Sequence, residues 1–296
     1  MFLVTQFIGL YVVNYYLDES HVLPFGMELP EEAPIECPMN SFIDFIKCTE
    51  YLYSLVVAFI IAVTLLFLFT KFELSFVLKL WFFVVVIIAL GISFNSLILF
   101  KYSLLISLLL ALPLSYIKIY KKEFLIHNFT ELFIYPGIAA VFVQILNMWT
   151  IIILLILISI YDMWAVWHSG IMQKMAKYQI DKLNIFSGFF VPYLSKNMRQ
   201  KIKKMKMTLK KSELKKKRIK INVAILGGGD IIFPIITAGV MLKTYNSFYP
   251  CLFVIAGATL GLSYLFFFAK KKKFYPAMPF ITAGIFIGMT LSYFLL

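Results

Sequence analysis

Two aspartates stand inside long apolar stretches of the sequence, where a charged carboxylate is costly. Asp162 lies in the segment ILISIYDMW, and Asp230 lies in the segment ILGGGDIIFP. An ionisable residue at the depth of a membrane usually marks a functional site and usually has a partner elsewhere in the membrane. Because other acidic residues such as Glu131 fall at the ends of apolar segments or in loops, we expect Asp162 and Asp230 to act as a pair.

The chemistry of such a pair follows from electrostatics. Two carboxyl groups held within a few ångströms cannot both ionise cheaply, so one stays protonated while the other remains a base. Aspartic proteases use this arrangement: the base activates a water, and the acid protonates the carbonyl oxygen and then the leaving nitrogen. Two other interpretations stay open on the aspartates alone. Each could hydrogen-bond between helices, or the pair could relay protons in a transporter.

The composition indicates an integral membrane protein. Of 296 residues, 61% are hydrophobic and 18% are aromatic, which leaves too little polar surface for a soluble domain of this length. A helix of about 20 apolar residues crosses a hydrocarbon core of about 30 Å. The sequence therefore predicts an all-α protein with nine transmembrane helices, at 1–17, 51–70, 80–100, 103–117, 129–148, 150–169, 221–242, 250–269 and 274–296.

The basic residues orient these nine spans. Membrane proteins retain an excess of lysine and arginine on the cytoplasmic side. With nine spans, 25 of the 28 basic residues fall on one side, and the acidic loop 18–50 falls on the other. We therefore expect a cytoplasmic N-terminus and an extracytoplasmic C-terminus. The chain then divides into spans one to six (1–173), a basic cytoplasmic loop (174–220) and spans seven to nine (221–296).

Glycines and a proline loosen the helix around the second aspartate. Gly227, Gly228 and Gly229 remove side chains just before Asp230 and allow another backbone to approach closely. Pro234 lacks the N–H that would have bonded the carbonyl of Asp230. A run of glycines also occurs where two membrane helices simply pack tightly, so this feature alone does not decide the function.

The start of the last span, in the segment KKKKFYPAMPF, is interrupted by two prolines. Pro276 and Pro279 disfavour helix at the residues before them, so we expect irregular backbone at Ala277 and Met278. Irregular backbone at membrane depth is tolerated only where it lines protein or a watery cavity. Its unpaired groups could bind an unwound substrate as an added strand. Taken singly, this proline pair is also typical of an ordinary helix start.

Together, these three elements resemble the presenilin and signal peptide peptidase family of intramembrane aspartyl proteases, and the topology resembles its compact archaeal-type presenilin homologues. The family carries Tyr-Asp in span six, Gly-x-Gly-Asp in span seven and Pro-Ala-Leu at span nine. Here the motifs read Tyr161-Asp162, Gly227-Gly228-Gly229-Asp230 and Pro276-Ala277-Met278. Two positions depart from the pattern, because Gly228 replaces a larger residue and Met278 replaces leucine. We expect both changes to alter substrate fit more than chemistry.

The resemblance implies an aspartic endopeptidase of the GxGD type that cleaves transmembrane segments or signal peptides without a cofactor or metal. Its catalytic residues would be Asp162 and Asp230. The residues supporting the site or the substrate would be Tyr161, Gly227, Gly228, Gly229, Pro276, Ala277, Met278 and Pro279.

The sequence itself offers little for a metal site, since His21, His127 and His168 are widely scattered. The alternative function is a polytopic channel or transporter that uses the two aspartates as a proton or cation site. No convincing inverted repeat supports that alternative. A prepilin peptidase shares Gly-x-Gly-Asp but lacks the third motif.

The basic loop suggests a second kind of partner besides the substrate. Within 196–220, apolar residues recur at helical spacing among many lysines. Such a segment could lie on anionic lipid at the inner membrane surface, or it could be a solvated linker. No recognised nucleic-acid-binding module accompanies the charge, so we expect no nucleic acid partner. In the outer loop, Cys37 and Cys48 could form a disulfide if the compartment is oxidising.

Overall fold

The computed structural model of the chain shows a helical bundle with one small sheet. It describes residues 1–18, 21–24, 75–100, 102–121, 123–169, 188–193, 222–268 and 275–295, with isolated positions between 53 and 72. The predicted second span, 51–70, lies largely outside the described residues. The cysteine pair of the outer loop and the basic segment 196–220 lie wholly outside them.

Eight α-helices carry most of the described residues. They are α1 (Phe2–Leu17), α3 (Ser75–Leu97), α4 (Ser103–Tyr116), α5 (Phe124–Ile145), α6 (Met148–Trp164), α10 (Gly228–Tyr245), α11 (Phe248–Phe268) and α12 (Met278–Leu295). Two of them continue as π-helical turns, α4 into η1 (Ile117–Lys121) and α6 into η2 (Ala165–Ser169).

Within the described residues, six helical segments are long and apolar enough to cross a membrane. These are Phe76–Leu97, Ser103–Lys121, Leu125–Ile145, Met148–His168, Phe248–Phe268 and Met278–Leu295, and α1 is a shorter apolar helix. The prediction of a helical membrane protein is therefore confirmed. The count of nine helices and the sides on which the termini lie stay predictions.

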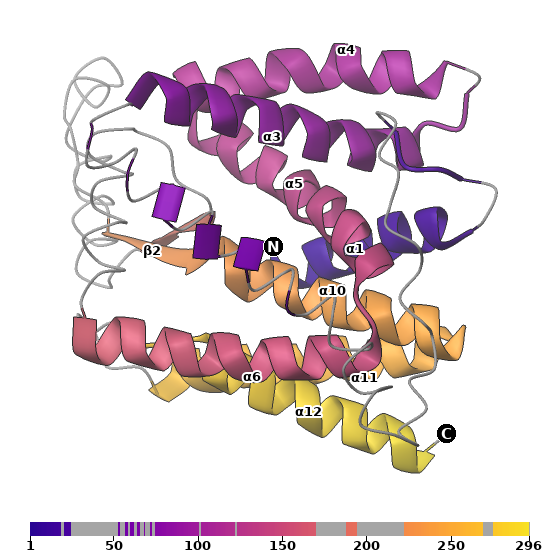
Figure 1. Ribbon diagram of the computed structural model, residues 1–296, viewed down its shortest axis with the longest axis vertical. Coiled ribbons are helices and arrows are strands. Elements are labelled where there is room, and N and C mark those ends of the chain that lie inside the picture. The colour runs from indigo at the N-terminus through magenta and orange to yellow at the C-terminus, as the bar shows by residue number, and fades with distance from the viewer. Residues whose placement is uncertain are drawn as a thin grey trace, which may run out of the picture.

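The bundle places α10 near its centre. Helices α3 and α4 form one side of the molecule and α6 and α12 the other, with α5 and α1 between them (Figure 1). The larger hydrophobic core combines residues of α1, α5, α6, α10, α11 and α12, and it includes the fully buried Ile231 and Ile235 of α10. A smaller core joins α3, α4 and α5. Helix α10, which carries Asp230, is thus enclosed by packed apolar side chains.

Glycines bring α11 and α12 into close contact. A Cβ atom at Gly257 would lie 2.1 Å from the carbonyl oxygen of Gly284, and a Cβ atom at Gly284 would lie 2.1 Å from the carbonyl oxygen of Gly257. One turn away, a Cβ atom at Gly261 or Gly288 would likewise lie 2.3 Å from a carbonyl oxygen of the other helix. Each helix therefore carries the glycine spacing that lets membrane helices approach backbone to backbone. The contact fixes α12, and with it the proline motif at the start of α12.

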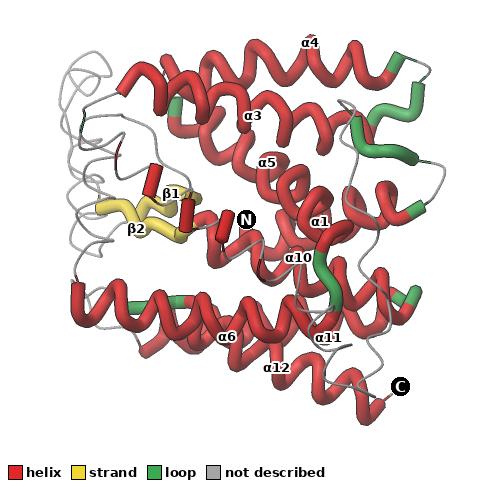
Figure 2. The backbone as a smooth tube through the Cα atoms, viewed as in Figure 1, coloured by secondary structure: helices red, strands yellow, loops and turns green. Residues whose placement is uncertain are grey.

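The predicted seventh span is wrong at its beginning, where the structure has a strand. Strand β2 (Asn222–Gly227) pairs with β1 (Gly188–Tyr193) in an antiparallel sheet, and Gly188 lies opposite Gly227. Figure 2 shows this sheet in yellow beside the start of α10. A short apolar run cannot be assigned to helix or strand by its periodicity, and β-branched residues favour strand. The all-α prediction therefore misses a two-stranded sheet, half of which falls in the predicted basic loop.

Other helix boundaries also differ from the prediction. The fourth span continues to Lys121 through η1, and the last span begins at Met278 instead of 274. The break between α5 and α6 has a clear cause at Asn147. The Asn147 side chain accepts a hydrogen bond from the Thr150 N–H at 2.9 Å, and the Thr150 hydroxyl accepts one from the Asn147 N–H at 2.8 Å. This reciprocal cap sets the start of α6.

We predict that Gly284→Val destabilises the protein. The added side chain has no space against the backbone of α11, and overpacking of this kind costs about 1–3 kcal/mol. The thermal unfolding midpoint in detergent should therefore fall. The control is Ile287→Val on the same helix, where the side chain is 61% exposed and the midpoint should barely change. Equal midpoints for the two variants would contradict the close contact of α11 with α12.

Candidate active site

Asp162 occupies the last turn of α6 and faces the start of α12. Its residue is only 8% exposed, and its Oδ2 accepts a hydrogen bond from the backbone N–H of Met278 at 3.1 Å. One turn earlier, the Ser159 hydroxyl donates to the Thr282 hydroxyl at 2.8 Å. These contacts join the same faces of α6 and α12, since residues three or four apart on a helix are neighbours.

The start of α12 explains why its N–H groups are available to a carboxylate. The first N–H groups of any helix have no partner inside the helix. Here Ala277 forms a bend outside the helix, and its carbonyl accepts the N–H of Ile281 at 3.1 Å. Pro279 in the first turn has no N–H, which leaves Met278 as the donor toward Asp162. The prediction of irregular backbone is thus confirmed at Ala277 and wrong at Met278, which is the first residue of the helix.

Asp230 lies at the beginning of α10, directly after strand β2. It is the third residue of the helix and the acidic residue of the first turn, and it is partly exposed. Its carboxyl group lies against Gly227, where a Cβ atom would come within 3.2 Å of Oδ2. A carboxylate in the first turn of a helix is stabilised by the helix dipole. Glycine at 227 keeps the space on this side of the carboxyl group open.

The two aspartates lie on helices that pack against each other. Helix α10 contacts both α6, which carries Asp162, and α12, whose start binds Asp162. Asp162 accepts the Met278 N–H at the start of α12, and Asp230 is in the first turn of α10, so each carboxyl group lies at a helix N-terminus. Such an arrangement can hold one proton between two acids and exchange it with a bound substrate.

Comparisons with known proteins agree with this geometry. The sequence model of the family described as signal-peptide peptidase, presenilin aspartyl protease matches residues 29–295. The chain belongs to this family. The fold also resembles that of a presenilin family intramembrane aspartate protease solved in space group P2, with a TM-score of 0.61 and 17% identity, covering 100% of this chain and 96% of that chain. A structure in space group C222 gives a TM-score of 0.60 and 18% identity, with 100% and 97% coverage. No curated protein matches the sequence significantly.

Membership in the presenilin and signal-peptide peptidase family makes the chain an integral, multi-pass membrane protein. The alternative of a channel or transporter gains no support from the comparisons. Among the residues that the structure describes, no three His, Cys, Asp or Glu side chains lie together as a metal site would require.

The remaining motif residues lie as follows. Pro276 and Met278 are buried and Ala277 and Pro279 are partly exposed, all at the start of α12 beside Asp162. Tyr161 is 47% exposed, and its ring lies 6.4 Å from that of Trp164. Its role at the site stays a prediction. Gly228 is buried at the first position of α10, and Gly229 is exposed beside it.

One residue near Asp230 was not predicted from the sequence. Gln6 of α1 is fully buried, and its side-chain amide donates to the carbonyl of Ile231 at 3.0 Å. This hydrogen bond ties α1 to the residue that follows Asp230. A glutamine inside an apolar span was the signal that could have identified it, because polar side chains in membranes usually bond across helices.

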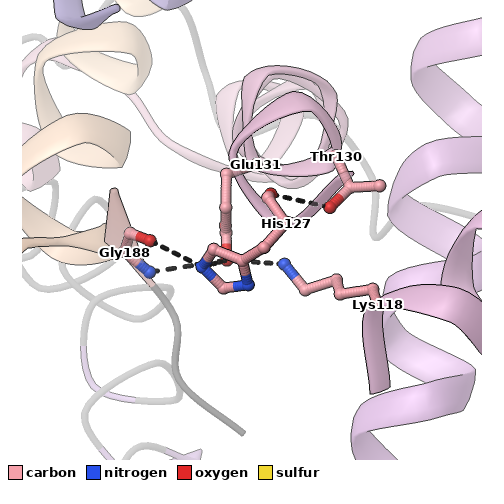
Figure 3. Close-up of polar contacts among 5 residues, drawn as sticks. All are labelled: Lys118, His127, Thr130, Glu131 and Gly188. Carbon is pink, nitrogen blue, oxygen red and sulfur yellow. Dashed lines mark hydrogen bonds and ion pairs between the residues drawn. The ribbon is translucent and has the colours of Figure 1, made fainter. Parts of the chain in front are cut away.

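A second group that sequence analysis missed is a buried cluster of Lys118, His127 and Glu131 (Figure 3). Each residue was interpreted separately, Glu131 as a residue at a span end and His127 as one of three scattered histidines. The spacing of His127 and Glu131 was the available signal, since residues four apart share a helix face. Lys118 lies on η1, and no pattern in the sequence indicates that it meets α5.

We predict that Thr282→Val lowers the rate of peptide cleavage about threefold. The change removes the acceptor of the Ser159 hydroxyl while keeping the side-chain shape, and hydrogen bonds between membrane helices contribute about 0.6 kcal/mol. The start of α12 would then be held less firmly against Asp162. Cleavage of a single-span substrate in detergent measures this effect.

The matched control is Thr290→Val, two turns further along α12. The Thr290 hydroxyl donates only to the carbonyl of Phe286 in its own helix, at 2.7 Å. This variant should cleave at the wild-type rate. If both variants lose the same activity, the bond between α6 and α12 has no special effect on the site.

Proposed function

We propose that this chain is an aspartic endopeptidase of the GxGD type that hydrolyses peptide bonds within transmembrane segments or signal peptides. The observation that carries the proposal is the placement of Asp162 and Asp230 on packed helices, with Asp162 bound to the N–H of Met278 at the start of α12 and Asp230 in the first turn of α10. Family membership supports the same activity. In the proposal, the pair of carboxyl groups shares one proton, so that one is a base and the other an acid.

The proposed reaction uses the pair in two steps. The ionised carboxyl group removes a proton from a water that attacks the peptide carbonyl, while the protonated one donates to the carbonyl oxygen. The proton taken from the water then passes to the leaving nitrogen as the C–N bond breaks. The other carboxylate takes a proton from one of the two hydroxyl groups of the tetrahedral intermediate, so the product carboxyl group forms and the pair again holds one proton. The burial of Asp162 and its hydrogen bond from Met278 support a fixed geometry for one member of the pair.

The sheet offers a place for an unwound substrate. A helical substrate must open before its peptide carbonyls can be attacked, because the helix occupies them in its own hydrogen bonds. Within the described residues the sheet has two strands, so each strand has an outer edge without a strand partner. A substrate segment added along such an edge would be extended and would run toward Asp230, since β2 leads directly into α10. The bend at Ala277 is a second candidate for such binding.

We also propose the arrangement of the chain in the membrane. Nine spans, a cytoplasmic N-terminus and an extracytoplasmic C-terminus are supported by the distribution of the basic residues. In this arrangement 1–173 holds spans one to six, 174–220 is the cytoplasmic segment and 221–296 holds spans seven to nine. The lysine-rich segment 196–220 is proposed to contact anionic lipid.

We predict that Asp162→Ala and Asp230→Ala each abolish cleavage of a single-span substrate, by a factor of about 10⁴ or more. The double variant should be no worse than either single variant, because groups that act as one unit lose their effect together. Initial rates with purified protein in detergent measure this. Binding of a hydroxyl-bearing transition-state analogue provides a second readout, since a transition-state analogue is held by the site that performs the reaction. Substantial cleavage by either single variant would end the proposal.

We predict a bell-shaped dependence of kcat/KM on pH. The reaction needs one carboxyl group protonated and the other ionised, so the rate falls when the pair holds two protons and falls again when it holds none. Rates between about pH 4 and 9, corrected for unfolding at the extremes, measure the two limbs. A flat profile, or activity that persists in Asp230→Asn, would show that Asp230 does not transfer protons.

A further inference from the structure

A buried ion pair lies away from the two aspartates, where the proposed reaction makes no use of it. Lys118 of η1 places its Nζ 2.5 Å from Oε1 of Glu131 on α5, and the two side chains are 5% and 1% exposed. Removing two opposite charges from water carries a large desolvation cost, which their mutual attraction often fails to offset. A purely structural contact between η1 and α5 could be made by apolar side chains, so the charges call for a further explanation.

The cluster holds one residue of strand β1 by both of its backbone groups (Figure 3). Nε2 of His127 lies 2.9 Å from the carbonyl oxygen of Gly188. Since a carbonyl can only accept, the hydrogen is on Nε2. The N–H of Gly188 in turn donates to Oε1 of Glu131 at 3.4 Å. Side chains of α5 therefore engage both the donor and the acceptor of this glycine.

The backbone conformation at Gly188 requires a glycine. Gly188 has a φ angle of 147°, a value that residues with a side chain rarely adopt. The next residue, Phe189, is fully buried, and its ring meets that of Tyr135 on α5 edge to face, with centroids 5.8 Å apart. His127, Glu131 and Tyr135 are spaced four residues apart and so share one face of α5. Strand β1 is thus docked along this face by polar contacts at Gly188 and by an aromatic contact at Phe189.

The contacts of β1 with α5 are connected to Asp230 through strand β2. Gly188 is the register partner of Gly227 on β2. Gly227 is the N-cap of α10. The Asp230 carboxyl group lies against it, since a Cβ atom added to Gly227 would be 3.2 Å from Oδ2 of Asp230. Any displacement of β1 along α5 would therefore move the residue against which the Asp230 carboxyl group rests.

We propose that Lys118, His127 and Glu131 form a clasp that fixes strand β1 on α5 and thereby positions Asp230. His127 and Glu131 are positioning residues, because they act on Asp230 through Gly188 and Gly227 and touch no reacting atom. Lys118 donates to the same oxygen of Glu131, Oε1, that accepts the Gly188 N–H, so the ion pair fixes the position of this acceptor. This inference rests on the proposed function, because it assigns the clasp a role in the cleavage by that same site.

Two double variants separate positioning from simple helix pairing. Lys118→Met with Glu131→Gln removes both charges and keeps a side-chain oxygen as an acceptor for the Gly188 N–H. Lys118→Met with Glu131→Leu removes both charges and the acceptor as well. Neither variant leaves a lone buried charge, which would destabilise the protein for a trivial reason. The two variants therefore differ in whether position 131 has an oxygen that can accept the Gly188 N–H.

We expect the variant with glutamine to cleave a single-span substrate at close to the wild-type rate. The variant with leucine should lose about tenfold or more in kcat with a smaller change in KM, because a small misplacement of a catalytic group has a large effect on rate. Amide hydrogen exchange in 222–227 should be faster in the leucine variant only. Equal kcat and equal exchange in the two variants would overturn the clasp and leave an ion pair that only joins η1 to α5.

A second pair of variants keeps the test decisive if the leucine variant fails to fold. His127→Gln retains a donor for the Gly188 carbonyl, whereas His127→Phe removes it, so only the phenylalanine variant should show the loss of kcat and the faster exchange. Matching behaviour of these two variants would also overturn the clasp. If the wild-type protein cleaves no substrate, the proposed function fails, and the exchange measurements still decide whether the cluster holds β1.

Discussion

A carboxylate inside an apolar bundle needs hydrogen-bond donors that have no other partner, and in this chain the starts of helices provide them. The first N–H groups of a helix are not bonded within the helix. Met278 directs its N–H to Asp162, and Asp230 is in the first turn of α10. Two unusual residues near the site fit this requirement. Pro279 has no N–H and is suited to the first turn of α12, and Gly227 leaves space for the carboxyl group of Asp230.

The same requirement explains why a strand precedes α10. If the seventh segment were helical from 222, Asp230 would lie inside a helix whose N–H groups were already bonded. Strand β2 ends the extended backbone at Gly227, so Asp230 is the third residue of the helix and the helix dipole acts on it. A strand in an apolar environment must have a partner for its own backbone groups. Strand β1 supplies it, and β1 is in turn bound to α5 through Gly188 and Phe189.

The sequence predicted the helices and the aspartate pair for a physical reason. Apolar segments of about 20 residues indicate membrane-spanning helices. Two ionisable residues within such segments are easily recognised, because few residues there are charged. The strand at 222–227 was not predicted, since a six-residue apolar run fits a helix or a strand and the partner strand lay in a segment read as a basic loop. The contact of Lys118 with Glu131 could not be predicted at all, because it depends on how η1 packs against α5.

The acidic residues on the described helices have two different kinds of partner, which indicates different purposes. Glu131 is buried with Lys118 at hydrogen-bond distance, so its carboxyl group has a fixed cation beside it. Among the described residues, no lysine, arginine or histidine forms an ion pair with Asp162 or Asp230. Asp162 instead accepts a backbone N–H, and Asp230 lies in the first turn of a helix, where the helix dipole favours a negative charge. A fixed cation would lock such a pair in one state, whereas backbone dipoles leave a proton free to be gained and lost, as acid–base chemistry requires.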